Sequence, residues 1–266
     1  MRIRSGRAVV HYELGGKPDA PALLMIRGLG RTRLHWGRVL DELAADFRLV
    51  TMDNRGVGDS SAPLPPYSTA SMARDAARVI EAAEVERAHV FGISLGGMVA
   101  QELAIRYPER IDRLVLGCTR AGAGSGPATP APVVRRMLGA MRLGAEGAVD
   151  ASAPLILGQR FIDEHPEVIA EWQKLARLQR ARVHGVLGQL LAAARHDAAD
   201  RLHRIRAKTL VVTGDADRMI PPENSRGIAG RIPGARLHIL PGAAHDFPTE
   251  RADETAELLR EFLLDA

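Results

Sequence analysis

The chain has 266 residues, of which 46% are hydrophobic and 26% are charged, and its formal net charge is +4. This length and composition are ordinary for a globular protein with one well-buried α/β core, with room for an insertion. The calculated pI is about 9.7. However, the basic residues are almost all arginine and they alternate with acidic residues, as in PTERADETAELLREF. A basic stripe is therefore absent from the sequence, and we expect no nucleic-acid partner.

Cysteine usage and apolar patterning exclude several further classes of protein. Cys118 is the only cysteine, so neither an internal disulfide nor a cysteine-based zinc cluster can form. The first sixteen residues lack the apolar run of a secretory signal, and no stretch is long enough to cross a bilayer. We therefore expect a cytoplasmic enzyme with no membrane partner, either a monomer or a small homo-oligomer.

Short apolar or β-branched runs recur along the chain and are separated by segments with helical spacing. The predicted strands cover 8–14, 22–26, 47–53, 87–93, 112–119, 209–215 and 236–241. The predicted helices outside the middle of the chain cover 33–46, 67–85, 95–107 and 250–266. Several strand runs are continuously apolar, which is typical of parallel strands covered on both faces. This alternation predicts an α/β fold with a mostly parallel sheet and helices on both faces.

The middle of the chain interrupts this alternation. A connector rich in glycine and proline, 120–132, is followed by helical patterns over 133–143, 166–179 and 182–195. In the last of these, one face gathers large apolar side chains: Val183, Val186, Leu187, Leu190 and Leu191. We therefore expect a core domain formed by 1–120 and 198–266, with a helical cap, 121–197, inserted in it.

Ser94 lies at the junction of a predicted strand and a predicted helix, within Gly92-Ile93-Ser94-Leu95-Gly96. This is the context required of a G-x-S-x-G nucleophile elbow, in which a sharp turn holds the serine hydroxyl above the strand ends. The flanking glycines avoid clashes with the neighbouring strand and helix. The amide of Leu95 lies at a helix N-terminus, so it is expected to point to the negative charge that develops on a substrate oxygen during the reaction.

A serine nucleophile needs a base, which needs a carboxylate in turn. His245 follows a predicted strand in a loop of small residues just before the last helix, so it is expected at the same edge of the sheet as Ser94. For the carboxylate we favour Asp217, three residues past Gly214, over Asp215, which we interpret as a turn residue. Asp246 ranks third, because adjacent residues in an extended loop usually point apart. The resulting order is Ser94, Asp217, His245.

A second donor to the oxyanion is expected from the loop after strand 22–26. The amide of Leu29 is exposed by its neighbours Gly28 and Gly30 and is the natural candidate. Asp53 and Asp59 could suggest a metal site, but no histidine or further carboxylate cluster accompanies them. We interpret them as loop scaffolding and expect neither a metal nor a cofactor.

Taken together, these motifs resemble the α/β-hydrolase superfamily over nearly the whole chain. The resemblance rests on RGLG (27–30), DNRGVGDS (53–60), GISLGG (92–97), GDADRMIPP (214–222) and PGAAH (241–245), in the order and spacing of that superfamily. The sequence is most similar to the enol-lactonase and small-ester hydrolase branch, near 3-oxoadipate enol-lactonases. The resemblance implies an α/β-hydrolase fold with a helical cap. It also implies Ser94 as nucleophile, His245 as base, Asp217 as orienting acid, and backbone donors at Leu29 and Leu95.

One residue departs from the pattern of that superfamily, which usually has histidine where this chain has Arg27. We interpret Arg27 as part of a structural ion pair that holds its loop, with an acid of the DNRGVGD segment as a candidate partner. The alternative is a cation that pairs with a carboxylate on the substrate. An acyl pocket beneath the cap could also be lined by large apolar residues: Trp36, Met98, Met137, Met141, Phe161, Trp172 and Phe247.

The sequence thus predicts acyl transfer from a small-molecule ester or lactone to water, through a Ser-His-Asp triad and an acyl-enzyme. Alternatives with the same triad are a carbon–carbon bond hydrolase, a thioesterase and a perhydrolase. A non-catalytic ligand receptor or pseudoenzyme is the alternative of another class.

Overall fold

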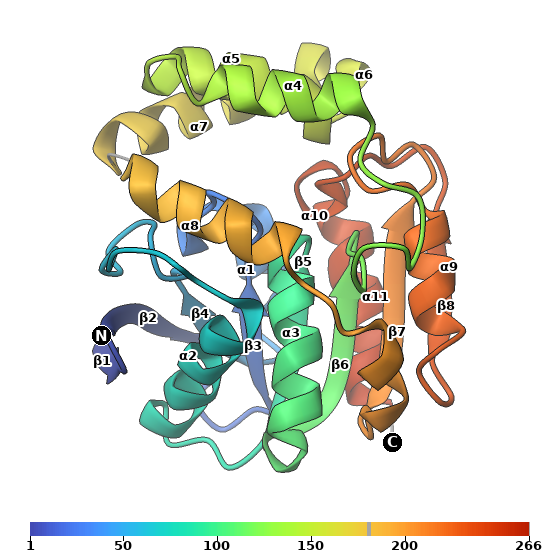
Figure 1. Ribbon diagram of the computed structural model, residues 1–266. Helices are drawn as coiled ribbons and strands as arrows, with labels where there is room; N and C mark the ends of the chain where they lie inside the picture. Colours follow the sequence, from blue (N-terminus) through green and yellow to red (C-terminus); the bar gives the residue numbers. More distant parts are fainter. Residues whose placement is uncertain (180–181, 266) are drawn as a thin grey trace.

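An eight-stranded sheet forms the centre of the computed structural model, which describes residues 1–179 and 182–265 (Figure 1). Its strand order is β1-β2-β4-β3-β5-β6-β7-β8. Strand β2 is antiparallel to both of its neighbours, and the remaining neighbouring pairs are parallel. The strands are β1 (Arg2–Ser5), β2 (Ala8–Gly16), β3 (Ala22–Ile26), β4 (Arg48–Met52), β5 (Ala88–Ile93), β6 (Ile111–Gly117), β7 (Lys208–Gly214) and β8 (Arg236–Leu240). The predicted mostly parallel sheet is confirmed.

The central strands form where the chain can bury side chains on both faces of the sheet. All residues of β3 and of β5 are buried, as expected for central parallel strands. Each predicted strand is found within two residues of its predicted ends. Strand β1 was not predicted, because RIRS is short and half charged; it forms through antiparallel pairing with β2 at the edge of the sheet.

Helices cover both faces of the sheet (Figure 1). One face carries α2 (Thr69–Ala82), α3 (Leu95–Arg106) and α9 (Glu223–Ala229), and their apolar side chains join one core cluster. The other face carries α1 (Arg38–Leu43), α10 (Phe247–Glu250) and α11 (Ala252–Leu264), which enclose a second cluster. The predicted helix 33–46 is divided: a 3₁₀ turn over Arg33–Trp36 ends at Gly37, whose φ of 49° stops the helix before α1 begins.

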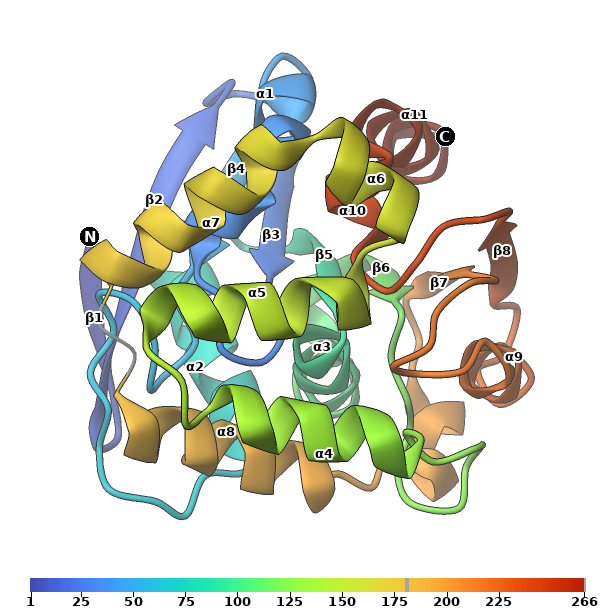
Figure 2. The ribbon, with the colours of Figure 1, turned by 90° about the horizontal axis from the view of Figure 1, so that it is seen from above.

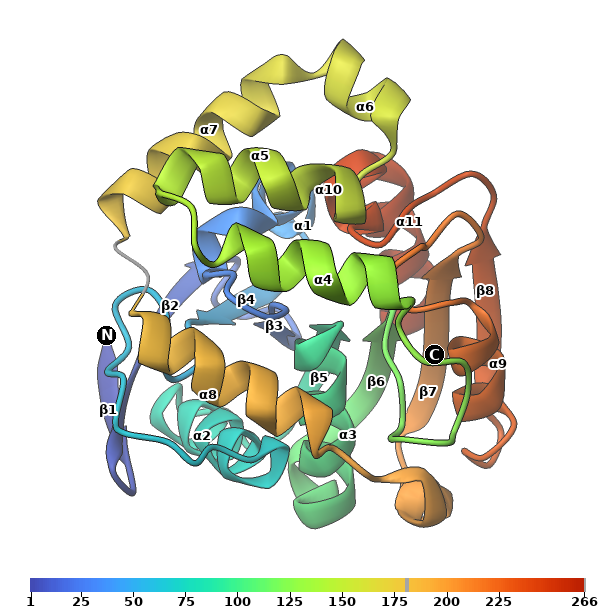
Figure 3. The same cartoon turned by 45° about the horizontal axis from the view of Figure 1, so that its top comes forward.

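Five helices lie over the carboxyl ends of the strands (Figures 2 and 3), and we call them the cap helices. They are α4 (Ala131–Ala140), α5 (Ala145–Ile156), α6 (Gln159–Glu164), α7 (Pro166–Leu178) and α8 (Val183–Ala194). The chain leaves the core and returns to it at adjacent points, because Gly122 pairs with Asp197 in an isolated antiparallel bridge. The amide of Ala198 also donates to the carbonyl of Ala121 at 2.6 Å.

The helix α8 packs on the core through its small residues rather than through its large apolar ones. A Cβ on Gly185 would lie 2.7 Å from the Cα of Gly56, and a Cβ on Gly188 would lie 2.6 Å from the ring of Tyr67. Val183 and Leu187, from the apolar face identified in the sequence, are instead 60% and 41% exposed. Glycine thus lets α8 approach the core closely. Within the described residues, no helix combines the length and apolar character needed to span a membrane.

Candidate active site

Ser94 lies between the end of β5 and the start of α3, at the carboxyl edge of the sheet. Its φ is 57° and its ψ is −120°, a backbone conformation that costs a non-glycine residue about 1–3 kcal/mol. The flanking glycines are required by packing. A Cβ on Gly92 would collide with the carbonyl of Gly96, and a Cβ on Gly96 would collide with the carbonyl of Ile26. The turn is fixed further by hydrogen bonds from the Ser94 amide to Gly117 and from the Thr119 hydroxyl to the Ser94 carbonyl.

The loop that follows β3 lies directly against Ser94. A Cβ on Gly28 would lie 3.1 Å from the Cβ of Ser94 and 3.5 Å from its Oγ, so glycine allows this approach. The amide of Leu29 donates to no other described group, whereas the amides of Gly30 and Arg31 are both bonded. Leu95 is the first residue of α3, so its amide has no acceptor within the helix. Two backbone donors without a partner among the described residues therefore flank the serine.

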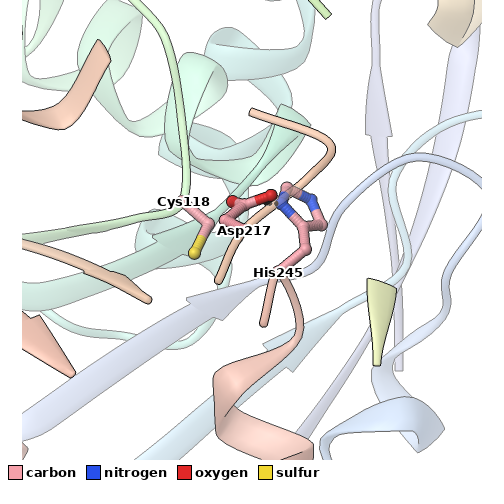
Figure 4. A group of neighbouring side chains, drawn as sticks. All are labelled: Cys118, Asp217 and His245. Atoms are coloured by element: carbon pink, nitrogen blue, oxygen red, sulfur yellow. Dashed lines mark hydrogen bonds and ion pairs between the residues drawn. The ribbon is translucent and has the colours of Figure 1, made fainter. Parts of the chain in front are cut away.

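His245 and Asp217 meet from two different strands (Figure 4). Asp217 follows β7 and His245 follows β8, and the Nδ1 of the imidazole lies 2.8 Å from the Oδ2 of the carboxylate. The other carboxylate oxygen accepts hydrogen bonds from the amides of Met219 and Ile220. Both side chains are buried. The carboxylate is thus held rigidly and fixes the orientation of the ring.

The electrostatic surroundings of His245 favour its protonated form. Burial acts to lower the pKa of the imidazole, but the charge and hydrogen bond of Asp217 outweigh burial and raise this pKa above its ordinary value of 6.5. The second ring nitrogen, Nε2, bonds to no described residue and is not sealed from solvent. A general base needs a free nitrogen of this kind.

The three carboxylates considered in the sequence have different partners. Asp217 contacts His245, whereas Asp215 is exposed and accepts a hydrogen bond from the amide of Gly242 at 2.6 Å, as expected of a turn residue. Asp246 does not bond to the imidazole and instead accepts two hydrogen bonds from Arg27, of 3.0 and 2.7 Å. The two adjacent residues His245 and Asp246 therefore have different partners.

Arg27 forms a buried ion pair, but its partner is Asp246 and not an acid of the DNRGVGD segment. That part of the prediction was wrong, because the loop after β8 crosses the edge of the sheet to meet the loop after β3. Asp53 instead accepts hydrogen bonds from the amide and guanidinium of Arg33 and from the amide of Asp59, and so stabilises this loop. Both terminal nitrogens of Arg27 are engaged and its Nε is sealed from solvent, so this guanidinium is not open to a substrate carboxylate.

The path of the 241–246 loop brings His245 over the same edge as Ser94. Strand β5 lies between β3 and the β7–β8 pair in the sheet, and the Arg27–Asp246 pair bridges from β3 to the loop after β8. The hydroxyl of Ser94 forms no hydrogen bond with His245 or with any other described residue. Catalytic hydrogen bonds are often long in unliganded sites and tighten when substrate binds.

The predicted pocket residues fall into two groups. Trp36, Met98 and Phe247 are at most 3% exposed and belong to the two core clusters, with Phe91 beside both Trp36 and Phe247. Met137, Met141, Phe161 and Trp172 come from the cap helices and their connections. Phe161 and Trp172 pack in a separate small cluster within the cap.

Cys118 is buried beside Asp217. Its Sγ, one carboxylate oxygen of Asp217 and one ring nitrogen of His245 lie within 4.8 Å of one another, which is close enough to hold a metal ion (Figure 4). Burial raises the pKa of the thiol well above its ordinary value, and the charge of Asp217 adds to this effect. Cys118 is therefore a neutral thiol, and the carboxylate between it and the imidazole already has its hydrogen-bond partners.

Two side chains near the site were not identified from the sequence. Gln189 of α8 is fully buried; its Oε1 accepts a hydrogen bond from the amide of Gly30, and its Nε2 donates to the carbonyl of Arg55. The guanidinium of Arg31 lies over the ring of Trp172, with its carbon 3.9 Å from the ring centroid. A glutamine on a helix and an arginine in an arginine-rich chain carry no sequence signal that marks them.

Comparison with known proteins identifies the family of hydrolases to which this α/β fold belongs. The model of the "Alpha/beta hydrolase family" matches residues 23–258. The chain belongs to this family, and the predicted α/β-hydrolase fold and superfamily are confirmed.

Curated relatives and solved structures agree with this assignment. A poly(3-hydroxyalkanoate) depolymerase of Ectopseudomonas oleovorans is 35% identical over 248 residues, which cover 93% of this chain and 86% of the relative. A putative carbamate hydrolase RutD of Azorhizobium caulinodans is 31% identical, over 97% of this chain and 96% of the relative. The crystal structure of an enol-lactonase of Burkholderia xenovorans superposes with a TM-score of 0.89 at 26% identity, over the full length of both chains. The similarity to the enol-lactonase and esterase branch thus extends to structure.

Proposed function

We propose that this hydrolase cleaves carboxylic esters or lactones through a Ser94–His245–Asp217 triad. The observation that carries the proposal is the strained backbone of Ser94, with φ of 57°, placed between two amide donors without a partner among the described residues. Strain of this kind persists only where the surrounding structure imposes it, and it is concentrated at functional sites. The Asp217–His245 hydrogen bond, 2.8 Å long, supplies the rest of the triad.

In the proposed mechanism, His245 Nε2 takes the proton of Ser94 Oγ as the oxygen attacks the ester carbonyl. The carbonyl oxygen becomes an oxyanion that accepts hydrogen bonds from the amides of Leu29 and Leu95; each such donor contributes about 2.7–4 kcal/mol. When the tetrahedral intermediate collapses, the imidazolium gives its proton to the leaving alkoxide. Water, deprotonated by His245, then attacks the acyl-serine, and the proton returns to Ser94 as the acid leaves.

The cap helices provide the cover of the proposed active site. We assign the cap to residues 121–197, which roof the carboxyl edge of the sheet and exclude water during the reaction. Phe161 is the cap side chain that we expect to face the acyl group, because it is only partly buried in the apolar cluster of the cap, whereas Trp172 is 3% exposed and stacks with Arg31.

The experiment that tests this function is hydrolysis of p-nitrophenyl butyrate by the parent protein and by Ser94→Ala. We expect turnover by the parent and a loss of about 10⁴-fold or more in the variant, since removal of a triad member abolishes the covalent route. Equal rates in both proteins, with both folded by circular dichroism, would overturn the proposal.

A second candidate substrate class is the carbamates, which is favoured by the relative named a putative carbamate hydrolase at 31% identity. The same acyl transfer applies, because a carbamate differs from an ester by a nitrogen beside the carbonyl. The two are separated by comparing p-nitrophenyl acetate with p-nitrophenyl N-methylcarbamate. Steady turnover of the carbamate favours that class, whereas a single burst followed by inhibition favours the ester.

A further inference from the structure

Arg31 lies between the core and the cap, next to the candidate oxyanion loop. It follows Leu29 by two residues, and its guanidinium stacks on Trp172 of α7, whose side chain is 3% exposed. Arg31 itself is only partly buried. Its guanidinium thus rests on a buried aromatic ring while the residue keeps part of its surface exposed.

The side chain of Arg31 has no acceptor among the described residues. Its neighbouring carboxylate, Asp246, already binds both terminal nitrogens of Arg27. None of the nitrogens of Arg31 is sealed from solvent. Burial lowers its pKa to about 10; the charge of Asp246 opposes this shift, and the charge of Arg27 adds a smaller part to it, so the guanidinium remains protonated at neutral pH. Among the described residues, Arg31 thus has no hydrogen-bonded counter-ion, although the charge of Asp246 attracts it.

Stacking determines which part of the guanidinium is free. When one face of the guanidinium lies on an aromatic ring, the N–H donors project in the plane and stay open to a ligand. A carboxylate fits this planar fork with two parallel hydrogen bonds, which are stronger than those between neutral groups. It would also relieve the cost of keeping a partly buried charge without a partner.

We infer that Arg31 binds a carboxylate carried by the substrate, so that the preferred substrates are esters or lactones with an anionic group. This inference rests on the proposed function. Binding of a substrate carboxylate was the alternative role considered for Arg27, but the guanidinium of Arg27 is paired with Asp246. Because Arg31 follows the candidate oxyanion donor Leu29 so closely, the bound carboxylate would lie beside the reacting carbonyl.

A purely structural role predicts different behaviour. If the contact with Trp172 serves only to hold α7 on the core, then loss of Arg31 weakens the cap and lowers the rates of all substrates alike. If Arg31 binds the substrate carboxylate, the loss falls on anionic substrates and changes the ratio between anionic and neutral ones.

The test uses two p-nitrophenyl esters of adipic acid, one with its second carboxyl group free and one with that group methylated. The ratio of their kcat/KM values is measured for the parent, Arg31→Gln, Arg31→Lys and Arg4→Gln. The last variant removes one exposed charge at the edge strand β1 and serves as the matched control. We expect the ratio to fall about 10- to 100-fold in Arg31→Gln, to take an intermediate value in Arg31→Lys, and to stay at the parent value in Arg4→Gln.

A binding measurement separates this inference from the proposed function. Free adipate should raise the unfolding temperature of the parent and of Ser94→Ala, and should raise it much less in Arg31→Gln. If the parent hydrolyses neither ester, the proposed function fails, and the adipate measurement alone decides the role of Arg31. An unchanged ratio in Arg31→Gln, or an equal response of parent and Arg31→Gln to adipate, would overturn the inference.

Discussion

Arg27 and Asp246 form a buried, bidentate ion pair that joins the loop after β3 to the loop after β8 across the edge of the sheet. The guanidinium also lies over the ring of Trp36, 4.7 Å from its centroid. Because Asp246 adjoins His245 and Arg27 adjoins Gly28, this single contact ties the proposed base to the loop that bears the candidate oxyanion donor. Two residues outside the proposed triad thus join two parts of the candidate site.

Breaking this pair should destabilise the protein strongly. Asp246→Asn leaves a buried guanidinium without its counter-charge, for which we expect a loss of about 3–5 kcal/mol in the free energy of unfolding, measured by urea denaturation. The exposed pair of Arg38 and Asp253 supplies the control, and Arg38→Met should cost less than about 1 kcal/mol. The double variant Arg27→Met/Asp246→Leu should recover part of the stability. Equal costs for the buried and exposed pairs would show that the pair is not structural.

The pKa of His245 predicts the acid limb of the pH profile. The base must be neutral to accept the serine proton, and its pKa is raised above 6.5, so kcat/KM should fall as the pH drops through a midpoint above 6.5. Asp217→Asn removes the charge that raises this pKa. In that variant the residual activity should be lower at every pH, and the acid limb should move to lower pH. A limb that stays in place in Asp217→Asn would contradict the assignment of Asp217 as the partner of His245.

The close approach of α8 to the core predicts opposite effects for two glycine substitutions. Gly185→Ala places a methyl group against the backbone of Gly56 and should cost about 1–3 kcal/mol of stability. Gly139→Ala, in α4 with open space around it, should instead stabilise the protein by about 0.5–1 kcal/mol. Thermal unfolding of both variants checks this contrast. A neutral Gly185→Ala would mean that α8 does not sit as tightly on the core as described.

Sequence reasoning succeeded where one physical constraint dominates. The strand runs are apolar because both faces of the sheet are covered, and Gly92 and Gly96 are glycine because no Cβ fits there. Ser94, His245 and three candidate carboxylates could therefore be placed at one edge of the sheet, whereas their catalytic roles stay a prediction. The positions of Asp217 and His245 in adjacent strand-end loops follow from the order of β7 and β8.

The parts that sequence could not supply depend on contacts between distant segments. The pairing of Arg27 with Asp246 depends on how the 241–246 loop crosses the sheet, which no local pattern encodes. The face of α8 that packs on the core could not be predicted, because glycine normally disfavours a helix. Here Gly185 instead permits close contact with Gly56. Arg31 and Gln189 acquire their positions only once the cap helices lie on the core.

Gln189 should influence the reaction through the loop that it holds. Its side-chain amide accepts a hydrogen bond from the backbone amide of Gly30 and donates one to the backbone carbonyl of Arg55. Gln189→Leu removes both hydrogen bonds, so the loop that carries Leu29 becomes less firmly held. We expect kcat for p-nitrophenyl butyrate to fall about 10-fold with little change in KM, because the oxyanion contact is made mainly in the transition state. Gln159→Leu, at an exposed position of α6, is the control. A change confined to KM would assign Gln189 to substrate binding instead.

Covalent labelling shows directly whether Ser94 is a nucleophile activated by His245. The parent, Ser94→Ala and His245→Ala are exposed to diethyl p-nitrophenyl phosphate, and the adduct is located by intact and peptide mass spectrometry. If Ser94 is the activated nucleophile, we expect one diethylphosphoryl group on the peptide that contains Ser94, none in Ser94→Ala, and labelling slowed by at least about 100-fold in His245→Ala. Labelling at another residue, or labelling of Ser94 at the parent rate in His245→Ala, would contradict this assignment.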